Sequence, residues 1–120
     1  MDIEMTWQQR KELNIHVVVV AYGLAHDLLT LFQKGNALNI RWHLFLHSTI
    51  PDVVQACNQI SDTYPNVIYF PCQENRGLSR SWNDGLISAY AMGADVAMIA
   101  NDDIDPEPDA IQLIARAAKD

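Results

Sequence analysis

Ile15-His16-Val17-Val18-Val19-Val20-Ala21 is the stretch that decides the fold of this chain. Most of its side chains are apolar and β-branched, with no steady alternation between apolar and polar, which is typical of a strand buried on both faces of a parallel sheet. The run is far shorter than the ~20 apolar residues that cross a bilayer. We therefore predict a central strand over 15–21, in a sheet that helices cover on both sides.

The rest of the chain alternates between helical and extended patterns. Four strand–helix units predict right-handed crossovers and a Rossmann-like α/β domain, with three α/β/α layers and a mostly parallel four-stranded sheet. Glycines end two of the helical patterns, at Gly35 and Gly93. Further strands are predicted over 40–46, 67–70 and 95–100, and helices over 24–35, from Pro51, from Leu78 and beyond Pro108.

Length and charge limit the classes of function. The 120 residues are 49% hydrophobic and 19% charged, as in a single soluble domain. A formal net charge of −7 with only 8 Lys and Arg argues against nucleic acid as a partner. Residues 1–14 lack the features of a secretory signal, which predicts a cytoplasmic protein. Cys57 and Cys72 have no metal or redox spacing and are predicted to be buried free thiols.

The carboxyl ends of parallel strands share one edge of a sheet, and ligands bind outside that edge where the strand order reverses. Four connections are predicted to reach it: 21–23, 47–49, 71–77 and 101–105. Asp102 and Asp103 directly follow the fourth strand, so their carboxylates should point to different sides. With Asp105 nearby, one could bind Mg²⁺ or Mn²⁺ and another a ligand hydroxyl. The alternative is that they cap the next helix or face solvent.

A second polar segment, 74–85, repeats the pattern Asn-x-Gly at Asn75 and Asn83. Gly77 either has an unusual backbone dihedral or is a plain turn glycine. Arg76 and Arg80 either meet phosphate or are solvated. Tyr22 and Trp82 could stack on a base, with core packing favoured for Trp82. The four histidines lack metal-ligand spacing, and three are predicted to be structural; the fourth, His47, is predicted to be a surface imidazole or to touch a bound molecule.

With these residues in place, the chain resembles, over 15–119, the nucleotide-binding portion of family 2 glycosyltransferases of the GT-A fold. The resemblance rests on Asn75-x-Gly77, Asn83-x-Gly85, Gly93-Ala94-Asp95 and Asn101-Asp102-Asp103, the last being similar to a DXD-type metal motif. It implies that Asp103 binds a divalent ion bridging the donor diphosphate, that Asp102 contacts the ribose or sugar, and that 21–23 lines the base pocket. The expected donor-binding residues are Ala21, Tyr22, Gly23, His47, Asn75, Arg76, Gly77, Asn83, Asn101 and Asp102, and the expected metal ligands are Asp103 and Asp102.

Two departures from the family pattern affect the expected activity. His47 stands where the family usually has an aspartate that reads the base or ribose. The chain stops at Asp120, before the half that binds the acceptor and supplies the general base. The resemblance thus implies a single, partial transferase domain that binds a nucleotide sugar and transfers it poorly to a saccharide, lipid or protein hydroxyl, with no general base assigned.

Two rival functions follow from the same residues. One is a non-catalytic nucleotide- or metal-binding module of the same fold. The other is a phosphate-accepting receiver domain, which is disfavoured because receivers carry their acidic pair after the first strand, where this chain has Ala21-Tyr22-Gly23. Self-association is expected if the face that would meet the acceptor half is apolar.

Overall fold

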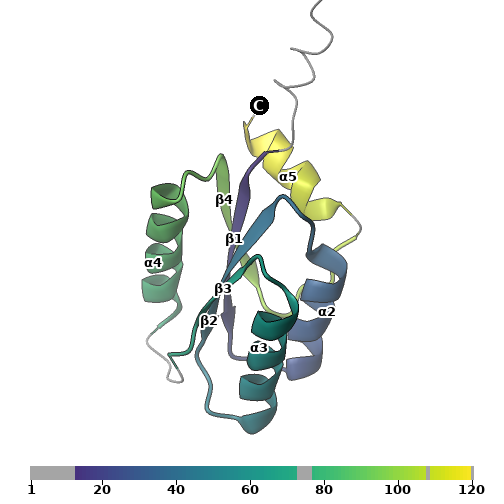
Figure 1. Cartoon of the computed structure of the whole chain (residues 1–120), viewed down its shortest axis with the longest axis vertical. Helices are drawn as coiled ribbons and strands as arrows, with labels where there is room; N and C mark the ends of the chain where they lie inside the picture. The colour runs from purple at the N-terminus through teal and green to yellow at the C-terminus, as the bar shows by residue number, and fades with distance from the viewer. Residues whose placement is uncertain (1–12, 73–76, 108, 120) are drawn as a thin grey trace, which may run out of the picture.

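Strands and helices alternate along the chain in the computed structural model, which describes residues 13–72, 77–107 and 109–119 (Figure 1). The predicted order of elements is confirmed, and the fourth strand begins and ends one residue later than expected. The elements are β1 (Ile15–Ala21), α2 (Ala25–Gly35), β2 (Ile40–Leu46), α3 (Pro51–Thr63), β3 (Val67–Phe70), α4 (Leu78–Ala91), β4 (Val96–Asn101) and α5 (Ala110–Lys119).

The four strands form one parallel sheet in the order β3-β2-β1-β4, a Rossmann-like topology. The chain adds β2 and then β3 on one side of β1, and then returns to the other side for β4. All seven residues of β1 are buried, as expected for the central strand. The strand order reverses between β1 and β4, so the carboxyl ends of these two strands flank the switch point of the sheet.

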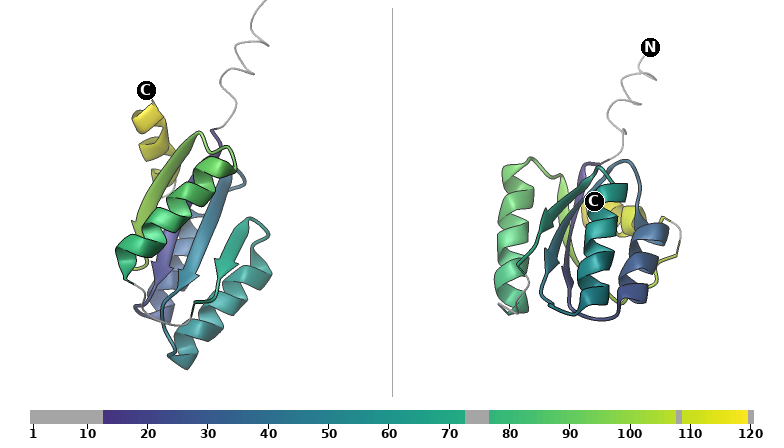
Figure 2. Two further views of the ribbon diagram at one scale, coloured as in Figure 1. Left: turned by 90° about the vertical axis from the view of Figure 1, so that its left-hand side faces the viewer. Right: turned by 60° about the horizontal axis from the view of Figure 1, so that its bottom comes forward.

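Helices cover both faces of the sheet unequally. Helices α2, α3 and α5 lie on one face, and α4 lies alone on the other (Figure 2). Alternate residues of β1 supply the two cores: Val17 and Val19 belong to the larger core under the three helices, and Val18 and Val20 to the smaller core under α4. The larger core is anchored by Phe32 and Trp42, whose ring centroids are 4.4 Å apart.

Helix α4 lies close to the sheet because small side chains line its buried face. Ser81, Gly85 and Ala89, spaced four residues apart, are buried on this face. Trp82 and Leu86 flank this line and pack against the smaller core while staying partly exposed. The buried line of α4 therefore consists of small residues, and the large ones lie beside it; the core packing favoured for Trp82 is confirmed. Gly93, with φ +83°, follows the helix and ends it as predicted.

Two histidines, His16 near the start of β1 and His43 in the middle of β2, are buried on the side of the sheet that carries α4. His16 Nδ1 and His43 Nε2 are 2.8 Å apart, so the N–H of one ring donates a hydrogen bond to the other ring. Burial and the nearby Arg41 lower the pKa of His16, and burial, His16 and Arg41 lower the pKa of His43 from 6.5 to about 4. Both rings are thus neutral members of the core, and the structural role predicted for them is confirmed.

The prediction of buried free thiols is confirmed for Cys57 and corrected for Cys72. Cys57 is a buried free thiol as predicted, whereas Cys72 is free but only partly buried. No helix within the described ranges has the length and apolar character needed to cross a bilayer.

Candidate functional site

The switch point brings two of the four predicted connections together. Val20 of β1 pairs with Asn101 of β4, so the chain leaves these strands side by side. The connection after β2 begins on the other side of β1 from β4. There the backbone N–H of His47 donates a hydrogen bond to the carbonyl of Ala21 at 2.9 Å. Of the connection after β3, residues 73–76 lie outside the described part of the chain.

Asp102 is turned into the protein at this point. Its carboxylate Oδ2 accepts hydrogen bonds from the backbone N–H groups of Tyr22 (2.9 Å) and Gly23 (2.8 Å), and the residue is only 3% exposed. Burial, with a smaller contribution from the negative charge of Asp102, raises the pKa of Cys57 on α3 to about 12. Ala100, two residues before Asp102, belongs to the larger core under α2, α3 and α5, so Asp102 is directed to the same side of the sheet, and it joins the end of β4 to the turn after β1.

Gly23 leaves room for this close contact. A Cβ atom at position 23 would lie 3.1 Å from Asp102 Oδ2, tighter than most Cβ contacts, so a side chain there would require the carboxylate to shift by a few tenths of an ångström. The predicted base-pocket segment 21–23 therefore has two backbone donors directed at an internal carboxylate. Ala21 is itself buried as the last residue of β1.

Asn101 and Asp103 flank Asp102 in sequence, and both are exposed. The predicted difference between the two adjacent aspartates is confirmed, because one carboxylate is buried and the other faces solvent. Tyr22 is 48% exposed and follows β1, and Asn101 and Asp103 lie at the end of the neighbouring strand β4, so all three stand at the same edge of the sheet. An exposed aromatic ring, a carboxylate and an amide at one sheet edge could hold a planar ring and a hydroxyl or cation.

The oxygen donors at this surface fit only one kind of metal site. Within residues 13–72, 77–107 and 109–119, no three His, Cys, Asp or Glu side chains gather where they could hold an ion. Carboxylate and carbonyl oxygens suit Mg²⁺ and Mn²⁺, and Mg²⁺ is commonly held by one or two carboxylates together with ligand phosphates and water. Asp103 fits such an open site, whereas a closed cage made only of protein side chains does not fit.

Asp105, expected near the metal, is directed elsewhere. Its Oδ1 accepts a hydrogen bond from Lys34 Nζ of α2 at 2.7 Å, and both side chains are exposed. Such a surface ion pair contributes little to stability. Asp105 thus belongs to the outer side of α2, next to a groove of about 470 Å³ lined by residues 33–34 and 105–107.

His47 is not the surface imidazole that was the favoured prediction. It is 5% exposed, and its Nε2 lies 2.7 Å from Oγ of the buried Ser81. The correction has a physical cause: the sheet continues past β2 far enough for α4 to cover this position. The imidazole ties the end of β2 to the first turns of α4, and a contact between His47 and a donor stays a prediction.

The residues of the second polar segment, 74–85, have different positions in the structure. Asn75 and Arg76 lie outside the described residues, so their predicted roles stay predictions. Gly77 is the N-cap of α4 with φ +89°, a left-handed conformation that favours glycine, and the unusual dihedral is confirmed. Asn83 is exposed on α4, whereas Gly85 is on the buried face of the same helix, against Val18. The repeated pattern therefore combines a helix cap with a packing glycine.

No protein-family model matches this chain, and no curated protein matches it. The geometry at the strand ends is thus the basis for any functional conclusion.

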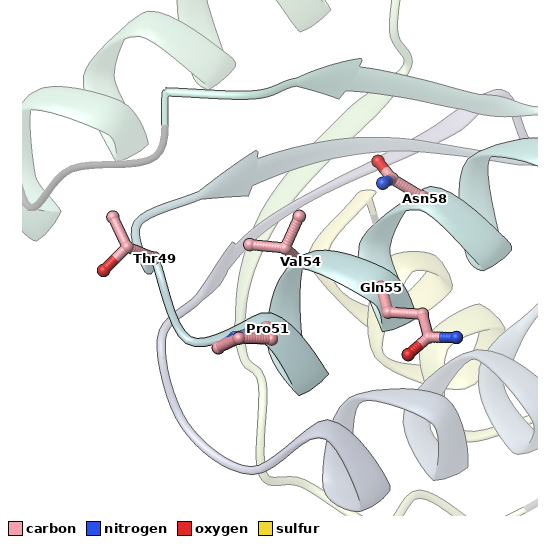
Figure 3. A pocket seen from close by; sticks show the side chains of 5 residues that line it. All are labelled: Thr49, Pro51, Val54, Gln55 and Asn58. Carbon is pink, nitrogen blue, oxygen red and sulfur yellow. The ribbon is translucent and has the colours of Figure 1, made fainter.

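A groove of about 440 Å³ lies beside the start of α3, lined by Thr49, Pro51, Val54, Gln55 and Asn58 (Figure 3). In the close view, Val54 and Asn58 project from the same side of α3, while Gln55 points away from them. The residues that line the groove come after β2 in the chain, and they do not include Asn101, Asp103 or Tyr22. We favour the switch point for chemistry, because it carries the exposed carboxylate.

Sequence reasoning missed two features of this region. Ser81 was not singled out, although its spacing of four from Gly85 and again from Ala89 is a signal of close helix packing. The bonding of Asp102 to the turn after β1 was also missed, because two residues 80 apart in the sequence are brought together only by the strand order.

Proposed function

We propose that this chain is the donor-binding portion of a GT-A glycosyltransferase similar to family 2, binding a nucleoside diphosphate sugar at the switch point. The observation that carries the proposal is the exposed carboxylate of Asp103, which follows β4 at the same edge of the sheet as the exposed Tyr22 after β1. Both lie where open parallel sheets bind their ligands. The sequence order of Asn75-x-Gly77, Asn83-x-Gly85 and Asn101-Asp102-Asp103 supports the same function.

In this proposal each exposed residue has a separate task. Tyr22 offers an aromatic face to the base, and Asn101 offers an amide to the ribose or sugar hydroxyls. Asp103 would hold Mn²⁺ or Mg²⁺. That ion, when bound, would offset the negative charge of the leaving diphosphate as an acceptor hydroxyl displaces it. The contribution of the chain itself is to bind and orient the donor, and no general base is assigned.

Calorimetry with uridine and guanosine diphosphate sugars, each with and without Mn²⁺, tests the proposal. We expect binding that depends on Mn²⁺, and Asp103→Asn should weaken it roughly tenfold or more, because the amide lacks the charge that holds the ion. Asp105→Asn is the matched control, since that carboxylate pairs with Lys34 and should change the affinity little. Equal losses in the two variants, or no binding by the wild type, would contradict the proposal.

A metal-independent nucleotide-binding module is the second candidate, and one observation favours it. Asp102, the other expected metal ligand, has its Oδ2 engaged by two backbone N–H groups. The same calorimetry separates the candidates: affinity unchanged by Mn²⁺ and by Asp103→Asn favours the module.

A further inference from the structure

Asp102 differs from the other aspartates at this edge because its carboxylate is almost fully buried. Removing a carboxylate from water is costly unless hydrogen bonds replace its hydration. Here two backbone N–H groups do so at 2.9 and 2.8 Å, within the short range of bonds to charged acceptors. These bonds identify the turn after β1 as a small anion-binding concavity that already holds an anion of the protein itself.

The turn is shaped for that carboxylate. Gly23 has no side chain, and a Cβ atom there would lie 3.1 Å from one carboxylate oxygen and 3.4 Å from the other. The donors come from Tyr22 and Gly23, which are consecutive in the chain, and both point at the same oxygen. A second anion at these donors would meet a carboxylate already in place, and like charges at that separation repel.

We propose that Asp102 is a positioning residue and not a metal ligand: its carboxylate fixes the turn after β1 to the end of β4 and keeps phosphate away from the turn's backbone donors. Asp103 is then the one carboxylate of this pair offered to a ligand. We call the pair of hydrogen bonds from Tyr22 and Gly23 to Asp102 the clamp. The clamp also holds the backbone of Tyr22 next to the end of β4, because the N–H of Tyr22 is bonded to the residue that precedes Asp103.

The clamp itself is independent of the proposed function, whereas the exclusion of phosphate rests on it. If a nucleoside diphosphate binds at the switch point, its phosphates must approach from the side of Asp103, outside the turn. This differs from nucleotide-binding sheets in which the glycine-rich turn after the first strand receives the phosphates directly.

Chemical rescue tests the clamp without any nucleotide. Asp102→Ala should lower the melting temperature by roughly 10 °C, because it leaves the partly buried N–H groups of Tyr22 and Gly23 without their charged acceptor. Formate, a free carboxylate small enough for the vacated space, should restore at least half of that loss. Asp103→Ala is the matched control and should lose little stability and gain nothing from formate. A loss in Asp102→Ala no greater than in Asp103→Ala, or a loss without selective rescue, would overturn the clamp.

A second variant covers the case in which Asp102→Ala does not fold. Asp102→Asn keeps an oxygen acceptor, so it should fold while its Tyr22 and Gly23 amides exchange faster with solvent than in the wild type. Where nucleotide binds, this variant should bind a nucleoside diphosphate more weakly and keep the dependence on Mn²⁺. Loss of the Mn²⁺ dependence itself would make Asp102 a ligand and overturn the proposal, whereas absence of binding by the wild type would count only against the proposed function.

Discussion

Replacing Gly85 with alanine should lower the free energy of unfolding by about 2 kcal/mol, although alanine is the better helix former by about 1 kcal/mol. The added Cβ would lie 2.5 and 2.8 Å from the two γ-methyl groups of Val18 and 3.1 Å from Phe45. Val18 is fully buried and β-branched, so it cannot turn aside. Helix α4 must then move away from the sheet. Urea denaturation monitored by circular dichroism measures the loss.

Two further variants isolate the cause. Ile87→Ala, on the exposed side of the same helix, should change stability little. As a single variant, Val18→Ala lowers stability because it leaves a cavity. It also removes the methyl groups that the Cβ of Gly85→Ala would contact. Adding Gly85→Ala to Val18→Ala should therefore cost at least about 1 kcal/mol less than adding it to the wild type. Additive losses would mean that the helix does not approach the sheet as closely as described.

Acid should destabilise the domain through the buried histidine pair by about 3 kcal/mol between pH 7 and pH 4. The pKa of His43 is lowered to about 4 in the folded state and returns to its ordinary 6.5 on unfolding, so the unfolded chain binds the extra proton. Stability from this residue is complete above pH 6.5 and is lost as the pH falls towards 4. The lowered pKa of His16 acts in the same direction. Urea denaturation at pH 7, 5.5 and 4.5 measures the slope.

The matched comparison is a double variant, His16→Gln with His43→Gln, whose amides can hydrogen-bond to each other but do not titrate in this range. It should show a clearly flatter dependence of stability on pH than the wild type. His26→Gln removes an exposed histidine and should keep the wild-type slope. A wild-type slope in the double variant would assign the acid sensitivity to other groups.

The fold could be predicted from the sequence because its signals are local. The apolar run 15–21 marks a fully buried strand, and Gly35 and Gly93 mark the ends of α2 and α4. Alternation of strands with helices then leaves few arrangements other than a parallel sheet. The strand order was not predicted, because it depends on which strands pair across the sheet, and no local pattern encodes that choice.

The candidate site was predictable only in outline. Asp103 is exposed at the expected edge, but the expected partner carboxylates are committed elsewhere, Asp102 to the turn after β1 and Asp105 to Lys34. His47 was misplaced for a related reason, since its contact with Ser81 depends on how closely α4 lies on the sheet. Such contacts join residues far apart in the chain, and local patterns do not say which distant residues meet. Of the two adjacent carboxylates expected to bind one ion, Asp102 is buried and Asp103 is exposed, and metal binding by either stays a prediction.

The central claim is that the carboxyl ends of β1 and β4 bind a nucleoside diphosphate sugar with a metal ion at Asp103. Nuclear magnetic resonance with paramagnetic Mn²⁺ tests it most directly, because bound Mn²⁺ broadens the amide signals of nearby residues. With the nucleotide sugar present, we predict broadening centred on Tyr22, Asn101 and Asp103, and its disappearance in Asp103→Asn. Broadening centred on the groove at Thr49 and Asn58, or none anywhere in the chain, would contradict the claim.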